Sequence, residues 1–394
     1  MLSPRHRAVQ DLASIGILMV ALALPGLGLA LGLDTAPPVN EQRTMAARPA
    51  LPTTRLAAQK YARQFDAFFR DHFGFRNGLL RLHNHLATSW LKRRPSETVE
   101  VLVGREGWLY YTGADAVRSI EGRSLFPEAG VRVWERTIRE RSRWLSQRGI
   151  RYLVVFAPEK GSIYPEHLPA WVRPSRQGTR LDQVMKVLSG IEGADVLDLR
   201  RPLLEAKRSS AHSIYPATDT HWNALGNHAA YSEIVTRLGR WFPGARPAPL
   251  SSFTLTWERR AGGDLARLLG LEHRFSETVP NLAPRTPGEA RRVDPGVYGA
   301  ARPEAAAYPP IVTERNGAEM RAAVMFRDSF ATDLVPLLSE HFGRAVYLWT
   351  VDFDCEAIER ENPAVVINEY AERVLYVLTP ANPPQVANTD QPVR

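Results

Sequence analysis

Three polar side chains have the types and spacing of an acyl-transfer site. Ser329 follows the apolar run 322–325 and precedes a predicted helix, so we expect it on a strand-to-helix turn. Asp219 and His221 stand two residues apart, just before another predicted helix. A carboxylate in that position can accept the imidazole Nδ1–H and leave Nε2 to take a proton from a serine. These residues therefore suggest nucleophilic catalysis by Ser329.

Each of these motifs can also have a role other than catalysis, in capping a helix, forming a turn or binding a metal. Asp328 or Ser329 can cap the helix that follows them. An Asp-x-His sequence can form an Asx turn in which Asn223 caps the next helix. A metal site at His221 is a third alternative, although further ligands are sparse nearby and the single cysteine, Cys355, is remote in sequence. The residues alone leave these alternatives open.

Two further strand ends contribute polar side chains. Asn368 ends the predicted strand 364–368, where its amide can donate to an oxyanion or serve as a turn residue. Lys160 follows the predicted strand 152–157 and can face an anionic substrate or pair with a carboxylate. Because the active residues of a doubly wound sheet gather at the carboxyl ends of its strands, we expect both near Ser329.

From residue 127 onward the sequence alternates between amphipathic helices and apolar strands. Continuous apolar strands separated by amphipathic helices are typical of a parallel sheet that is covered on both faces. We therefore predict an α/β domain with a mainly parallel sheet. The predicted strands are 152–157, 195–199, 322–325, 345–349 and 364–368, and the predicted helices are 131–148, 181–189, 224–238, 333–341 and 355–360.

Residues 12–33 form an uncharged run of 22 residues that is preceded by Arg5 and Arg7. At about 1.5 Å per residue this run is long enough to span the ~30 Å hydrocarbon core of a bilayer. Positive charge ahead of the first apolar span favours a cytoplasmic N-terminus, which places the rest of the chain outside the cytoplasm. A cleaved signal peptide is the alternative, and it gives the same compartment.

The domain organisation follows from these patterns. The predicted segments are a cytoplasmic tail at 1–11, a transmembrane signal-anchor at 12–33, a tether with helices at 34–99, the α/β domain at 100–378 with a proline-rich surface excursion at about 243–316, and a disordered tail at 379–394.

Composition excludes several classes of protein. A single cysteine excludes an intramolecular disulfide framework and a multi-cysteine zinc site. One apolar span excludes a multi-pass transporter. The formal net charge is +8, but the basic residues are dispersed and the predicted compartment is not that of nucleic acid, so we expect no nucleic-acid partner.

The ordered set of motifs resembles the SGNH-hydrolase-like domain of the alginate O-acetyltransferase proteins, the AlgJ and AlgX kind. The predicted anchor and the end of the chain soon after the sheet, without a further carbohydrate-binding module, are closer to the AlgJ kind. The matching motifs are Asn40 to Arg43, Phe68 to Asn77, Val103 to Tyr110, Pro158 to Lys160, Ile163 to Glu166, Thr218 to Asn223, Gly263 to Ala266 and Phe326 to Phe330.

The resemblance implies a three-layer α/β/α fold in which the Asp-x-His motif precedes the serine. It makes Ser329 the nucleophile, His221 the general base and Asp219 the carboxylate that orients the imidazole. Arg327 replaces the glycine of the family's Gly-Asp-Ser block, and its guanidinium can bind a carboxylate or phosphate. The expected oxyanion and substrate-binding residues are Asn368, Arg327, Lys160 and Tyr164.

The implied function is a membrane-anchored periplasmic O-acetyltransferase of the inner membrane. Through an acetyl-serine intermediate and without a cofactor or metal, it would acetylate hydroxyls of an exopolysaccharide such as alginate during synthesis and export. The implied partners are a membrane-bound O-acyltransferase that donates the acetyl group, and other polysaccharide synthesis and export proteins. The alternatives are an acetyl-polysaccharide esterase with the same triad and a non-catalytic scaffold of the export complex.

Overall fold

A computed structural model of the chain describes residues 4–33, 36, 44–89, 100–298, 308–377 and 380. Its residues separate into two compact units, Met1–Val101 with Asp264–Phe275, and Leu102–Gly263 with Ser276–Arg394. The predicted disordered tail at 379–394 lies outside the described residues except for Pro380.

The first unit is helical. Its helix α1 spans Pro4–Leu31, and the stretch Leu12–Leu31 is long and apolar enough to cross a membrane, a property that signal sequences share. Thr54 caps the next helix by accepting a hydrogen bond from the backbone N–H of Ala57. The other helices of this unit are α2 (Arg55–His72), α3 (Arg76–Ser89) and α10 (Asp264–Leu268).

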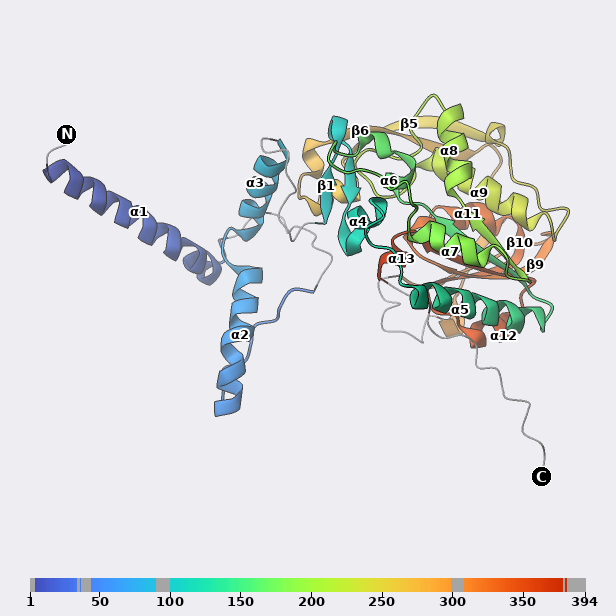
Figure 1. Cartoon of the computed structure of the whole chain (residues 1–394), viewed down its shortest axis with the longest axis horizontal. Helices are drawn as coiled ribbons and strands as arrows, with labels where there is room; N and C mark the ends of the chain where they lie inside the picture. The colour runs from blue at the N-terminus through green and yellow to red at the C-terminus, as the bar shows by residue number, and fades with distance from the viewer. Residues whose placement is uncertain are drawn as a thin grey trace. The chain divides into compact units, whose positions relative to one another are not determined.

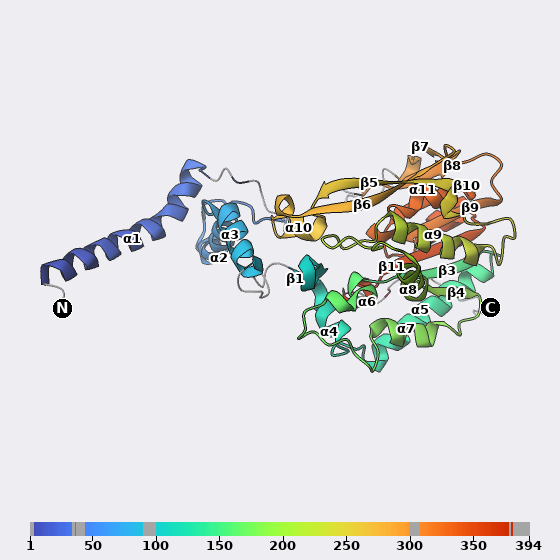
Figure 2. The same cartoon turned by 90° about the horizontal axis from the view of Figure 1, so that it is seen from above.

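The second unit is built on a seven-stranded sheet (Figures 1 and 2). The first five strands are parallel and the last two pair antiparallel at one edge. The three central parallel strands, β3, β11 and β9, are buried almost throughout, as a sheet covered on both faces requires. In spatial order the strands are β4 (Ala194–Asp198), β3 (Arg151–Ala157), β11 (Val365–Ala371), β9 (Met320–Arg327), β10 (Phe342–Trp349), β8 (Ile311–Glu314) and β7 (Arg291–Val293).

Helices cover both faces of this sheet, and each face has its own apolar core (Figure 1). One core includes residues of α8 (Arg200–Ser209), α9 (Ala224–Leu238) and α11 (Leu334–Ser339). The other includes residues of α5 (Glu128–Ser146), α7 (Arg180–Leu188) and α12 (Cys355–Glu361). The structure also contains the short strands β1 (Val101–Val103) and β2 (Leu109–Tyr111) and the short helices α4 (Ala116–Ile120), α6 (Lys160–Ile163) and α13 (Val374–Val377).

The predicted three-layer α/β architecture and its five parallel strands are confirmed. The prediction of a surface excursion at 243–316 is wrong in part. That region contains an antiparallel hairpin, β5 (Phe253–Ala261) with β6 (Ser276–Pro284), and the edge strands β7 and β8 of the main sheet. Strand β5 is exposed after its first residue, so its sequence lacks the apolar alternation that marks a half-buried strand.

Candidate active site

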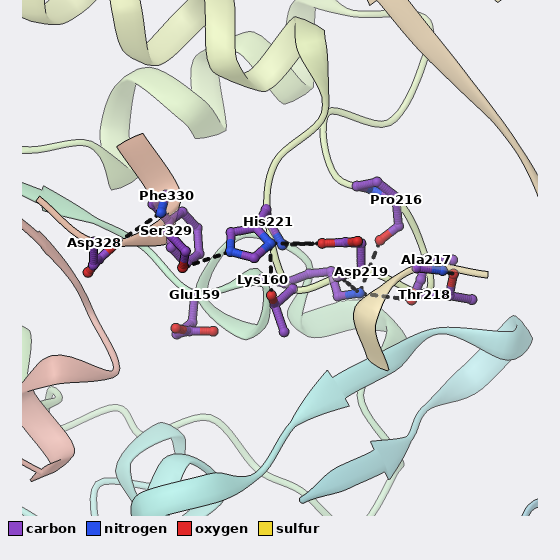
Figure 3. A network of polar contacts seen from close by, with 12 residues as sticks. Glu159, Lys160, Pro216, Ala217, Thr218, Asp219, His221, Asp328, Ser329 and Phe330 are labelled. Carbon is purple, nitrogen blue, oxygen red and sulfur yellow. Dashed lines mark hydrogen bonds and ion pairs between the residues drawn. The ribbon is translucent and has the colours of Figure 1, made fainter. Parts of the chain in front are cut away.

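Ser329 lies just beyond the carboxyl end of β9, on a short 3-10 turn. The cap of this turn is Asp328, whose Oδ1 accepts the N–H of Phe330 at 2.9 Å. The other carboxylate oxygen accepts the N–H of Ala371 at 2.6 Å, which ties the turn to the end of β11. The capping role therefore belongs to Asp328, and the half-buried Ser329 hydroxyl points away from it (Figure 3).

His221 reaches that hydroxyl from the segment before α9 (Figure 3). Its Nε2 lies 2.9 Å from Ser329 Oγ, and its Nδ1 lies 2.9 Å from Asp219 Oδ1. The same carboxylate oxygen accepts the backbone N–H of His221 at 3.0 Å, which fixes the short Asp-x-His turn. Asn223 does cap α9, accepting from the N–H of Leu225, so capping and the Ser-His-Asp arrangement coexist.

Lys160 holds this segment in place from the end of β3 (Figure 3). Its Nζ donates to the backbone carbonyls of Pro216, Ala217 and Asp219 at 3.0, 2.8 and 2.7 Å. The residue is only 2% exposed. The expectation that Lys160 faces an anionic substrate is therefore wrong, because its buried ammonium binds backbone carbonyl oxygens. The alternative expectation, pairing with a carboxylate, stays a prediction.

The hairpin supports the same segment from its other side. Glu277 accepts the backbone N–H of Thr218 at 2.9 Å and its hydroxyl at 2.6 Å. That hydroxyl accepts the N–H of Gly263 at 2.7 Å. A Cβ at Gly263 would come within 2.6 Å of the Asp219 side chain, so only glycine fits there.

Two residues expected in the site lie in the core instead. Asn368 is an interior residue of β11 with 0% exposure, and its Oδ1 accepts the hydroxyl of Tyr152 at 2.8 Å, so it does not end its strand beside an oxyanion. Tyr164 is also buried, and its hydroxyl accepts the N–H of Ile214 at 2.9 Å. Burial raises the pKa of the Tyr164 phenol, as expected for a structural tyrosine.

Arg327 is close to Ser329 in sequence but is buried at the end of β9. Its guanidinium lies over the Trp349 ring, 4.7 Å from the centroid, and donates to the Asp328 carbonyl and the Thr332 hydroxyl at 3.1 Å each. Burial lowers the pKa of this guanidinium. The Arg327 guanidinium thus contacts groups of its own chain, and its binding of a substrate carboxylate or phosphate stays a prediction.

Sequence reasoning missed the acidic groups behind the site. Glu369 Oε2 accepts the N–H of Asp328 at 3.0 Å, and burial, followed by the nearby Asp328 carboxylate, raises the pKa of Glu369 well above its usual range. Arg373 pairs with Glu159 and lies over the Phe330 ring. Glu369 directly follows the predicted strand 364–368, and this position at a strand end is a signal that could have identified it. No sequence feature marked Arg373.

Glu372 is a third buried acid, placed just after β11. Its Oε2 accepts the backbone N–H of Glu159 at 3.0 Å and the Ser162 hydroxyl at 2.7 Å. Burial raises the pKa of Glu372 to about 7, although the Ser162 hydrogen bond opposes that rise.

Comparison with known proteins relates this chain to a known family. A family model described as "SGNH hydrolase-like domain, acetyltransferase AlgX" matches residues 101–299, which include Asp219 and His221 but end before Ser329. The chain is 27% identical over 228 residues to the "Probable alginate O-acetylase AlgJ" of Pseudomonas aeruginosa. This match covers 58% of the chain and 55%, about half, of that relative.

A solved structure shares the fold. PatB1 of Bacillus cereus aligns with a TM-score of 0.52 and 19% sequence identity, over 70% of this chain and 96% of that one. At this identity the likeness concerns the fold alone.

We predict that Glu372 makes the protein less stable as the pH rises. Because the native state holds this proton up to about pH 7 whereas an unfolded glutamate loses it near pH 4.5, the native state binds more protons between these values. The free energy of unfolding should fall by about 3 kcal/mol from this group as the pH rises across that window. Urea unfolding of Glu372→Gln between pH 4.5 and pH 7 should show a flatter pH dependence than wild type.

Glu356→Gln, a change at an exposed glutamate of α12, is the matched control and should keep the wild-type pH dependence. If the free energy of unfolding of Glu372→Gln depended on pH as strongly as that of wild type, the raised pKa of Glu372 would not be the cause of the pH dependence.

Proposed function

Since this chain belongs to the family of SGNH hydrolase-like acetyltransferases of the AlgX kind, we propose that it is a polysaccharide O-acetyltransferase with Ser329 as its nucleophile. The observation that supports the proposal most is the hydrogen-bonded series from Ser329 Oγ through His221 to Asp219, with 2.9 Å at each step. This is the geometry by which a serine is activated for acyl transfer.

In the first half-reaction, His221 Nε2 takes the Ser329 proton while Oγ attacks the carbonyl carbon of the acetyl donor. The imidazolium that forms is stabilised by Asp219, which accepts the Nδ1–H. His221 then gives its proton to the leaving group, and the acetyl group stays on Ser329 as an ester.

The tetrahedral oxyanion of this step needs hydrogen-bond donors. The Ser329 N–H begins the 3-10 turn, and first-turn N–H groups have no acceptor within their own helix. The next N–H, that of Phe330, already donates to Asp328. We therefore assign the Ser329 N–H as an oxyanion donor and withdraw the assignment of Asn368, which is buried in β11.

In the second half-reaction, an acceptor hydroxyl gives its proton to His221 while its oxygen attacks the carbonyl carbon of the acetyl-serine. The ester bond to Ser329 Oγ then breaks, and His221 returns the proton to that oxygen. The family description and the name of the Pseudomonas aeruginosa relative favour a sugar hydroxyl over water as this acceptor. A polysaccharide, alginate or a similar exopolysaccharide, is accordingly the proposed substrate, modified during its synthesis and export.

The apolar stretch Leu12–Leu31 supports a single-pass inner-membrane anchor with the second unit in the periplasm. Acetyl-CoA is a cytoplasmic metabolite, so the donor on the outer side must be delivered through the membrane. A membrane-bound O-acyltransferase is the proposed partner for that delivery.

Ser329→Ala should remove activity without unfolding the protein. The lost hydroxyl contacts His221 and caps nothing, so the free energy of unfolding should change by only about 1 kcal/mol. Loss of the nucleophile should lower the rate of acetyl-ester cleavage, and of polymer acetylation in cells, by several orders of magnitude. The exposed Ser251→Ala is the control and should match wild type. If cells with Ser329→Ala acetylate the polymer fully, the protein is not the acetyltransferase, and the alternative of a non-catalytic scaffold of the export complex is favoured.

Asp219→Asn should keep the shape of the site but favour the imidazole tautomer that cannot accept the serine proton. The rate should fall by about four orders of magnitude. The melting temperature should stay close to that of wild type, because the side chain has the same size. A rate within tenfold of wild type, measured with a chromogenic acetyl ester, would show that Asp219 does not orient His221.

We also expect the chain to have its second unit outside the cytoplasm. An alkaline phosphatase fused after Arg394, which is active only after export, should be active in intact cells. The same fusion without residues 1–33 should be inactive. Activity of a strictly cytoplasmic reporter at that position would overturn the assigned orientation.

A further inference from the structure

A cavity of about 280 Å³ lies between the β5–β6 hairpin and the segment that leads to Asp219 and His221. All of its lining residues belong to the second unit. Its walls include His212, Ser213, Ala217, Trp257, Glu277 and Thr278. The catalytic roles proposed above do not use this cavity.

The wall of the cavity contributed by β5 is an exposed indole. Trp257 is 42% exposed, and the His212 ring lies 4.4 Å from it, tilted by 57°. The Trp108 and Tyr215 side chains, which also line the cavity, are buried. An exposed tryptophan on a concave surface offers an apolar, electron-rich face. The C–H groups on one face of a pyranose ring fit such a surface.

The polar groups of the cavity suit hydroxyls. The lining residues Ser213 and Thr278 carry side-chain hydroxyls, and the lining residue His212 carries an imidazole. Each of these groups can donate or accept a hydrogen bond, as sugar hydroxyls can. An aromatic wall with a few polar groups is the composition of a small-molecule site.

The charge of the cavity disfavours an acidic sugar. Among the described residues that line it, the one carboxylate is that of Glu277, which already accepts two hydrogen bonds from Thr218. None of the described residues that line the cavity is lysine or arginine. A uronate carboxylate would therefore lie near a like charge without a cation to pair with.

Residues that line the cavity are joined to the segment of the proposed catalytic residues, Ala217 through the backbone and Glu277 through hydrogen bonds. Ala217 lines it and precedes Asp219 by two residues, a chain distance of at most about 7 Å. Thr218, between them, is held by the Glu277 carboxylate. A sugar in the cavity would thus lie against the segment that positions His221.

We propose that this cavity is a subsite for a neutral pyranose unit of the acceptor polysaccharide, with Trp257 as its stacking platform. The assignment to an acceptor rests on the proposed acetyl transfer, whereas sugar binding itself does not require it. The acceptor chain then contains neutral pyranose units, which narrows the proposed substrate to an exopolysaccharide other than alginate, a polymer made only of uronates.

The test is titration of the full-length protein with oligosaccharides, followed by intrinsic fluorescence and calorimetry. The full-length protein is solubilised in a detergent without a sugar headgroup, because a maltoside detergent would compete with the oligosaccharides for the cavity. The probes are cellotetraose as the neutral pyranoside and tetramannuronate as the anionic one. Cellotetraose should bind more tightly, and Trp257→Ala should weaken its binding by about tenfold or more.

Trp171→Ala is the matched control, because Trp171 is also an exposed tryptophan and does not line the cavity. It should keep the wild-type affinity for cellotetraose. Equal binding by wild type and Trp257→Ala, no binding of either probe, or tighter binding of tetramannuronate would each overturn the proposal.

Ester cleavage measured on the same samples separates this proposal from the proposed function. If cleavage depends on Ser329 but cellotetraose does not bind, the subsite alone is wrong. If cellotetraose binds through Trp257 but cleavage does not depend on Ser329, the cavity is a sugar site and the acetyl-transfer proposal is wrong.

Discussion

The buried ammonium of Lys160 is the interaction on which the arrangement of the site depends. Burying a charge is costly unless polar groups replace its water shell. Here three carbonyls between Pro216 and Asp219 do so, within a segment that has no regular secondary structure of its own. Without the ammonium the Pro216 and Asp219 carbonyls would lose the donor that Lys160 provides, whereas the Ala217 carbonyl would keep the N–H of Leu109. The segment would also lose one of its attachments to the end of β3. One lysine thus satisfies the backbone and sets the position of Asp219 and His221.

The short 3-10 turn that carries Ser329, the serine turn, is attached to the end of β11 by the carboxylate of Asp328, whereas the segment before α9 is held by the Lys160 cation. Asp328 accepts N–H groups from its own turn and from the end of β11, and its own N–H donates to Glu369. Burial, and then the nearby Asp328 carboxylate, raises the pKa of Glu369 well above its usual range and so favours the neutral form of this buried acid. Since β11 lies between β3 and β9, it links the two halves of the site.

The fold and the three central residues could be predicted because their signals are local. A buried parallel strand is a continuous apolar run, and Asp219 and His221 are close in sequence. The supporting residues could not be predicted, because their roles depend on side-chain direction and on backbone partners. Neighbouring strand residues point to opposite faces, so Asn368 enters the core although the next residue, Glu369, contacts the serine turn. The carbonyl partners of Lys160 have no sequence signature at all.

The segment from Pro216 to Asn223 is held at several points, and this restricts how a substrate can act on it. Lys160 binds its first carbonyls, Glu277 binds Thr218, and Asn223 is committed to capping α9. A segment fixed in this way has little conformational entropy left to lose when a ligand binds beside it. An acceptor sugar would therefore find His221 already in place, and its binding energy would serve to position its own hydroxyl. Selectivity between polymers then has to come from the walls of the neighbouring cavity, where aromatic surface and the scarcity of cations favour neutral sugars.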